Sequence, residues 1–177
     1  MQFLIGITGL MGSGKSTAAD HIVKKYGFTR MRLSGKMREI GIELGLEITR
    51  DFLQSCGKFF REFDDDIWVR YLVREIQKTS ASIVIDDIRR MNEVVYLKPL
   101  GFKFIRIQSS SEKRRTRIEV RGKKRISNLD WKRWSDHLTE TQVLQLPVDY
   151  IIENDGSLEE LRIKIDAVME KVLGQDN

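Results

Sequence analysis

Residues 9–17 decide the fold of this chain, and they read Gly-Leu-Met-Gly-Ser-Gly-Lys-Ser-Thr. They fit the pattern G-x-x-x-x-G-K-[ST], in which backbone N–H groups curl around phosphates and the following helix points its positive end at them. The apolar run at residues 3–7 predicts a buried strand before the motif, and residues 16–26 predict a helix after it. This context indicates a loop that binds the phosphates of a nucleoside triphosphate rather than a glycine-rich turn with an incidental lysine.

Each residue type in the loop has a chemical reason. Glycines allow backbone conformations that a Cβ atom would forbid, so N–H groups can approach the phosphates. Lys15 can reach the β- and γ-phosphate oxygens, and the Ser16 hydroxyl can bind Mg²⁺, which we expect as the cofactor. The expected ATP contacts in the loop are Gly9, Met11, Gly12, Ser13, Gly14, Lys15, Ser16 and Thr17.

The composition describes an ordinary globular protein. Its 177 residues are one domain's worth, with 41% hydrophobic and 32% charged residues. No apolar run approaches the roughly 20 residues of a membrane span. One cysteine and two histidines leave no internal disulfide framework and disfavour a structural zinc site. We therefore expect a cytoplasmic protein that does not associate with membranes.

Expected strands and helices alternate along the chain. Strands are expected at residues 3–8, 28–33, 82–85, 102–108 and 148–152, and helices at 16–26, 34–45, 49–63, 65–76, 92–100, 109–121, 130–138 and 157–172. Residues 123–129 are polar and predict a loop or flap. The alternation predicts an α/β fold of three layers, in which helices cover both faces of a parallel sheet of about five strands. Ligands bind such sheets at the carboxyl ends of the strands.

Asp86 and Arg89 lie where such an end is expected, directly after the apolar residues 83–85. A carboxylate beside the phosphate loop can accept a hydrogen bond from Ser16 and hold a Mg²⁺-bound water. An arginine there can grip a phosphate with two parallel hydrogen bonds. The alternatives are two acids that cap a turn and an arginine in solvent.

Arg117 and Arg121 are four residues apart and project from one face of a helix. Two like charges on one face repel unless an anion lies between them, which favours a role in neutralising charge during phosphoryl transfer. A solvated basic helix is the alternative. The expected catalytic residues are Lys15, Asp86, Arg117 and Arg121.

Three stretches resemble the P-loop nucleoside monophosphate kinase superfamily. They are residues 49–69, the run Ile85-Asp86-Asp87-Ile88-Arg89 with Asn92-Glu93, and residues 148–158. Within that superfamily the chain looks most like the deoxynucleoside monophosphate kinases of phages and prokaryotes, and dephospho-CoA kinase is a near relative. The resemblance implies one kinase domain over residues 1–177, with a helical acceptor-binding region at 34–79 and a lid at 117–135.

The resemblance also implies roles for matching residues. It places Arg117, Asn154 and Gly156 against ATP. It implies that the acceptor is held by Ser34, Arg38, Arg50, Gln54, Arg61, Asp86 and Arg89. From the helical pattern alone, Arg38 fits a cleft and a wet face equally well.

The expected reaction is transfer of the ATP γ-phosphoryl group to a (deoxy)nucleoside monophosphate. A first alternative changes the acceptor to dephospho-CoA or another small phosphorylated metabolite. A second is a nucleic-acid-associated P-loop ATPase, since the net charge is +5 and basic residues crowd into residues 106–133. Arginines at lid spacing explain that crowding without nucleic acid. The sequence leaves open the preferred base and sugar, and whether a homodimer forms.

Overall fold

A computed structural model of the chain describes residues 2–135 and 142–174, apart from the side chains at positions 50 and 133–135. The sheet of this described part has five strands in the order β2-β3-β1-β4-β5. All four pairings are parallel. The strands are β1 (Leu4–Thr8), β2 (Thr29–Met31), β3 (Ile83–Ile88), β4 (Lys103–Gln108) and β5 (Tyr150–Glu153). The predicted α/β fold with a five-stranded parallel sheet is confirmed.

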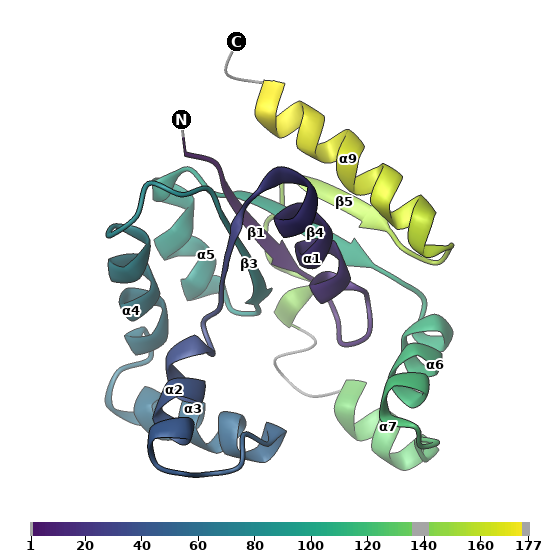
Figure 1. Cartoon of the computed structure of the whole chain (residues 1–177). Helices are drawn as coiled ribbons and strands as arrows, with labels where there is room; N and C mark the ends of the chain where they lie inside the picture. Colours follow the sequence, from purple (N-terminus) through teal and green to yellow (C-terminus); the bar gives the residue numbers. More distant parts are fainter. Residues whose placement is uncertain (1, 136–141, 175–177) are drawn as a thin grey trace.

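Helices cover both faces of the sheet (Figure 1). Helices α1 (Lys15–Tyr26) and α9 (Leu158–Gly174) pack on one face, with Ile22 and Ile165 buried against Ile5 and Val84. Helices α4 (Ile67–Ile76) and α5 (Met91–Leu97), the latter followed by a 3₁₀ turn (Lys98–Leu100), pack on the other face. Successive strand residues point to opposite faces, so β1, β3 and β4 contribute side chains to both cores.

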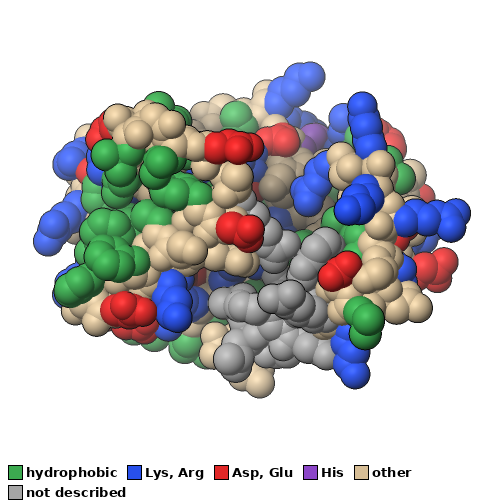
Figure 2. Space-filling model, turned by 90° about the horizontal axis from the view of Figure 1, so that it is seen from below, with side chains coloured by type: hydrophobic (Ala, Val, Ile, Leu, Met, Phe, Trp, Pro, Cys, Tyr) green, Lys and Arg blue, Asp and Glu red, His purple; other side chains and the backbone are tan. Residues whose placement is uncertain are grey.

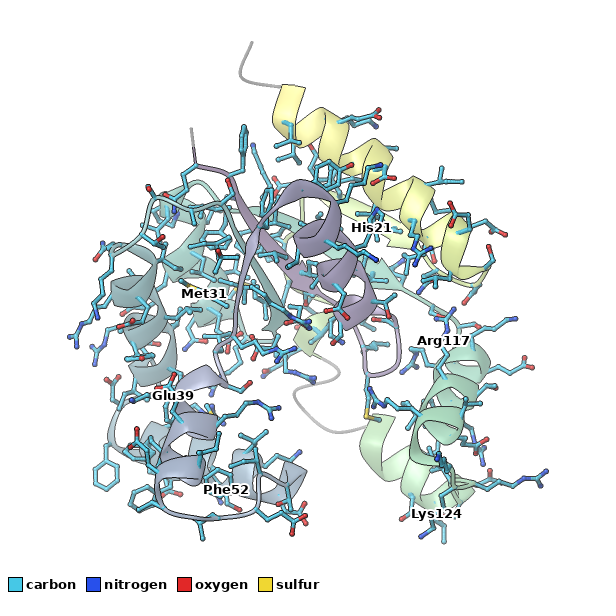
Figure 3. The ribbon with its side chains drawn as sticks, viewed as in Figure 1. His21, Met31, Glu39, Phe52, Arg117 and Lys124 are labelled. Atoms are coloured by element: carbon cyan, nitrogen blue, oxygen red, sulfur yellow. The ribbon has the colours of Figure 1, made fainter. Side chains whose placement is uncertain are left out.

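Four further helices form two arms beyond the carboxyl edge of the sheet, shown at the lower left and lower right of Figure 1. One arm holds α2 (Gly35–Glu43) and α3 (Arg50–Phe63), and the other holds α6 (Ser111–Gly122) and α7 (Asn128–Ser135). Thr49 caps α3 through a 3.1 Å hydrogen bond from the Phe52 N–H. Phe52 in turn packs against Gly41 of α2 (Figure 3).

The two arms differ in surface chemistry, as Figure 2 shows from below. Hydrophobic side chains gather on the α2–α3 side, where Ile42, Leu44, Phe59 and Phe63 are exposed. Lysines and arginines gather on the α6 side, and those that are exposed there are Lys113, Arg121, Lys123, Lys124 and Arg125. The cationic arm is the one beside the phosphate loop.

Some predicted boundaries were wrong. The segment 123–129 is not all loop, because α7 begins at Asn128. The hydroxyl of Ser127 accepts a 3.0 Å hydrogen bond from the Asp130 N–H, which caps this helix at its start. The predicted helix 130–138 ends beyond residue 135, outside the described residues. No helix in the described part of the chain is long and apolar enough to cross a membrane.

Candidate functional site

The phosphate loop lies between the end of β1 and the start of α1, at the centre of the sheet. Gly12 and Gly14 have φ values of 79° and 106°, conformations that favour glycine. Helix α1 begins at Lys15, so its positive end points into the loop. The Lys15 ammonium group donates to the carbonyl oxygens of Gly9 and Leu10, at 2.6 and 2.8 Å. The loop thus holds a buried lysine and a helix N-terminus in one place.

Asn154, at the end of β5, braces this loop. Its side-chain amide donates a 2.7 Å hydrogen bond to the carbonyl oxygen of Ser13. Arg117 of α6 donates to the Asn154 carbonyl oxygen at 2.8 Å and to the Ser109 hydroxyl at 3.0 Å (Figure 3). Two of the predicted ATP contacts, Arg117 and Asn154, therefore lie at the loop. Gly156 is exposed nearby, two residues after Asn154.

Arg114 is a further contact between α6 and the loop, and sequence reasoning missed it. Only 6% of Arg114 is exposed. It donates to the carbonyl oxygens of Ser109 and Met11, at 3.2 and 3.3 Å, and its guanidinium lies 5.3 Å from the ring centre of Trp131. Arg121, the other half of the predicted lid pair, is exposed in the last turn of α6. The structure therefore places Arg117, but not Arg121, against Asn154, the residue that holds the phosphate loop.

Asp86 is the most heavily hydrogen-bonded side chain of the site. The Ser16 hydroxyl donates to its Oδ2 at 2.9 Å, so the structure brings together the two residues proposed to hold Mg²⁺. Arg30 also donates to both carboxylate oxygens, through Nε at 2.9 Å to Oδ1 and through Nη2 to Oδ2. The Nε of Arg32 adds a bond of 3.3 Å to Oδ1.

These arginines set the charge state of Asp86. Burial raises the pKa of Asp86, which is only 4% exposed, but the bonds and charge of Arg30 outweigh burial and hold this pKa below its usual value. Burial likewise opposes the charge on Arg30, yet Asp86 raises the pKa of Arg30 above its usual value. Sequence reasoning missed Arg30 and Arg32. The only available signal was their spacing, since residues i and i+2 of a strand share a face.

Asp87 holds the segment in which the predicted acceptor residue Ser34 lies. It accepts hydrogen bonds from the backbone N–H groups of Leu33 and Ser34, at 2.9 and 3.0 Å, and from the Ser34 hydroxyl at 2.9 Å. Ser34 occupies the N-cap position of α2, but its side chain makes no capping bond. The Ser34 hydroxyl bonds to Asp87 instead. Asp87 fixes the link from β2 to α2.

Two other predicted acceptor residues, Arg38 and Arg61, are partly buried. The buried Nε of Arg38 has no hydrogen-bond partner within the described residues. Burial lowers the pKa of Arg61, and the neighbouring charge of Arg90 lowers it further. Gln54 is exposed on α3, and the side chain of Arg50 lies outside the described part.

Arg89 begins a turn that Glu93 holds from inside. The buried Glu93 carboxylate accepts from the backbone N–H groups of Arg89 and Arg90, at 2.7 and 3.0 Å. Burial raises the pKa of Glu93 to about 7. Arg90 pairs with Asp65 at 2.9 Å and so ties this turn to the start of α4. The sequence identified Glu93 only as part of the motif that resembles the kinase superfamily. The structure shows that its carboxylate holds the turn at Arg89 and Arg90.

A cavity of about 330 Å³ borders the loop at Leu10. It lies at the carboxyl ends of β4 and β5, where ligands of parallel sheets bind. Its other lining residues are Ile107, Gln108, Ser109, Ser110, Leu144, Glu153 and Asp155. The cavity is at the small end of the size range for ligand pockets.

Comparisons with known proteins agree with this architecture. A UPF0200 protein of Aeropyrum pernix is 25% identical over 170 residues, covering 92% of this chain and 90% of that protein. The crystal structure of TT1252 from Thermus thermophilus matches with a TM-score of 0.64 and 22% identity, over 96% and 97% of the two chains. Shikimate kinase from Acinetobacter baumannii, in complex with shikimate, matches with a TM-score of 0.66 and 18% identity, over 98% and 94%.

These structural matches show a fold shared with P-loop kinases. The family comparison goes further, because residues 5–136 match the AAA domain. That range holds the phosphate loop, Asp86 and the lid arginines, and it is well over half of the chain. This protein belongs to the AAA domain family.

Proposed function

We propose that this protein is a kinase that transfers the γ-phosphoryl group of ATP to the phosphate of a (deoxy)nucleoside monophosphate. The observation that carries the proposal is a contrast between the two carboxylates at the end of β3, both occupied by hydrogen bonds, and the arginines expected on the acceptor side. Asp86 and Asp87 are the carboxylates at the end of β3. Asp86 is saturated by hydrogen bonds from Ser16, Arg30 and Arg32, and Asp87 accepts three bonds from residues 33 and 34.

This contrast favours a phosphate over a hydroxyl as the accepting group. A hydroxyl must lose a proton when it attacks, so a kinase that uses one benefits from a general base whose pKa is near the working pH. The pKa of Asp86 lies below the usual value of a carboxyl group, which makes Asp86 a poor base. An acceptor phosphate is already an anion and needs only positioning and charge neutralisation. Arg38 and Arg61 supply cations of the required kind.

The donor half of the proposal rests on the phosphate loop. Its glycines, Lys15 and the start of α1 form a cradle for a polyphosphate, the chemistry that such loops provide. Arg117 lies one contact away, on Asn154, where it can balance charge at the phosphates. Arg121 would approach only if the end of α6 moved toward the loop.

The residues present also fit Mg²⁺. The Ser16 hydroxyl donates a hydrogen bond to Asp86. The lone pairs of the Ser16 oxygen therefore stay available to bind a hard cation. Within the described residues no group of three or more His, Cys, Asp or Glu side chains could hold a metal ion. Mg²⁺ commonly takes one or two protein oxygens together with substrate phosphates and water. Ser16 and Asp86 would hold it, and it would supply positive charge at the phosphates during transfer.

Matched acceptors test the proposal. ADP release should be measured with each (deoxy)nucleoside monophosphate, with the corresponding nucleoside that lacks the phosphate, and with dephospho-CoA, whose accepting group is a hydroxyl. We expect turnover with at least one monophosphate and none with its nucleoside. Turnover with dephospho-CoA alone would favour the alternative acceptor, and no stimulation by any monophosphate would refute the proposal.

A variant pair separates the acceptor site from the fold. Arg38→Gln removes a guanidinium expected to grip the acceptor phosphate, so the acceptor KM should rise at least about tenfold, the size of one charge-assisted hydrogen bond. The affinity for ATP should not change. Arg162→Gln, at an exposed arginine of α9 outside residues 34–79, is the control and should leave both values unchanged. Equal effects of the two substitutions on the acceptor KM would contradict the assignment.

A further inference from the structure

The carboxylate of Asp86 has no hydrogen-bonding capacity left. A carboxylate accepts about four hydrogen bonds, two on each oxygen. Its Oδ1 accepts from the Nε atoms of Arg30 and Arg32, at 2.9 and 3.3 Å. Its Oδ2 accepts from Ser16 at 2.9 Å and from Nη2 of Arg30. A water molecule bound to a metal ion could reach Asp86 only if one of these donors left.

The two arginines are held very differently. The Arg30 side chain is 17% exposed, bonds to both carboxylate oxygens and forms a second ion pair with Asp20 of α1. The Arg32 side chain is 39% exposed and makes a single, longer contact at 3.3 Å. Ser16 belongs to the phosphate loop and faces the same cation site. Arg32 is therefore the donor that leaves Asp86 at the smallest cost.

The charges near Asp86 also indicate that Arg32 leaves the carboxylate more easily than Arg30. A divalent cation beside Ser16 repels any guanidinium on Asp86, and the repulsion is stronger where water is excluded. Arg30 is held against this repulsion by Asp20 as well as by Asp86. Arg32 has no second carboxylate within ion-pair distance among the described residues, and it borders solvent. It can turn outward without leaving a buried charge unpaired.

We propose that Arg32 and the metal–nucleotide complex compete for Oδ1 of Asp86, so that Arg32 occupies the carboxylate only while the donor site is empty. This inference rests on the proposed binding of ATP with Mg²⁺ but not on the identity of the acceptor. When Mg²⁺ and ATP bind, Arg32 swings away and a water on the metal ion takes its place on Asp86. Arg30 stays and keeps the carboxylate ionised.

Release of Arg32 also changes the acceptor side. Arg32 lies in the short link between β2 and α2, next to Leu33 and Ser34, which Asp87 holds in place. A guanidinium that leaves Asp86 from this link adds a positive charge beside the segment expected to hold the acceptor. Binding of the donor would thus prepare the site for a second anion.

Calorimetric binding of the non-hydrolysable analogue β,γ-imido-ATP tests the competition without turnover. The dissociation constant is measured with excess Mg²⁺ and with EDTA. The constant with EDTA divided by the constant with Mg²⁺ reports how strongly the metal helps the nucleotide to bind. Arg32→Ala removes the competitor, so this ratio should rise about fivefold over the unmodified protein, the size of one net hydrogen bond. Arg32→Lys keeps a charge but lacks the Nε donor, and its ratio should fall between the two.

Other roles for Arg32 give other results. If Arg32 only attracts the phosphates, its loss weakens binding equally with and without Mg²⁺, and the ratio stays the same. If Arg32 helps to build the metal site, the ratio falls. Either result would overturn the proposal, provided that Arg162→Gln leaves the ratio unchanged and both Arg32 variants melt within a few degrees of the unmodified protein. Failure of every acceptor in a kinase assay would leave this test unaffected.

Discussion

Glu93 offers the sharpest prediction of pH-dependent stability. It is buried beneath the turn that carries Arg89, and burial raises its pKa from 4.5 to about 7. The folded protein therefore keeps a proton on Glu93 at pH values where the unfolded chain has lost it. The stability that Glu93 contributes is fully present below pH 4.5 and is lost as the pH rises through 7.

The size of this loss follows from the two pKa values. Each pH unit between them lowers the free energy of unfolding by about 1.4 kcal/mol, which gives a total of about 3 kcal/mol. Glu93→Gln removes the titration but keeps an oxygen that can accept from the N–H groups of Arg89 and Arg90. The variant should therefore gain on the unmodified protein as the pH rises from 5 to 8.

Urea unfolding at half-unit steps from pH 5 to pH 8 measures the effect. The other titrating groups are common to both proteins, so the difference in unfolding free energy isolates Glu93. We expect this difference to change by about 2.5 kcal/mol between pH 5 and pH 8 and to level off above about pH 7. Curves that run parallel within about 0.5 kcal/mol, the usual size of a neutral surface change, would refute the reasoning. They would mean that the two N–H donors balance the cost of burying the charge.

Three further substitutions test the architecture of the site. Gly14→Ala places a Cβ at a φ of 106° and against the Asn154 amide, so the free energy of unfolding should drop by about 2 kcal/mol or more; an unchanged melting temperature would contradict this. Arg117→Ala removes the contact with the Asn154 carbonyl and a cation near the phosphates, so calorimetry should give about tenfold weaker ATP binding; equal affinity would remove Arg117 from the donor site. Asp87→Ala removes the carboxylate that accepts the hydrogen bond of the Ser34 N–H. The KM for the phosphoryl acceptor should therefore rise several-fold while the affinity for ATP stays the same. A loss confined to ATP binding would contradict a role of Asp87 in acceptor binding.

Local signals carried most of the fold prediction. The loop motif and the apolar strands each depend on a few neighbouring residues, so they can be recognised in the sequence. Boundaries were less certain where pairing depends on another strand. Asp149 was expected inside the last strand, yet β5 begins at Tyr150. Asp149 still bonds to β4 through its N–H and its carboxylate, both on the backbone of Phe104.

The candidate site shows the same division. Ser16 and Asp86 could be paired in advance because parallel strands end at one edge of the sheet. Arg30 and Arg32 could not, because their direction depends on the register of β2 against β3, in which Arg30 lies opposite Val84. Nothing in the sequence near residue 30 states that register. The arginines that occupy Asp86 therefore emerge only from the assembled sheet.

The brace between Asn154 and Ser13 has a consequence for how the protein is made. It joins residues that are 141 positions apart, and the strands on either side of β1 also come from far along the chain. During synthesis the loop sequence is made before β3, β4 and Asn154, which hold it in the folded protein. A nascent chain therefore contains the loop sequence long before the loop can adopt its folded conformation. Nucleotide can therefore stabilise only the nearly completed polypeptide, which makes its binding a report on finished folding.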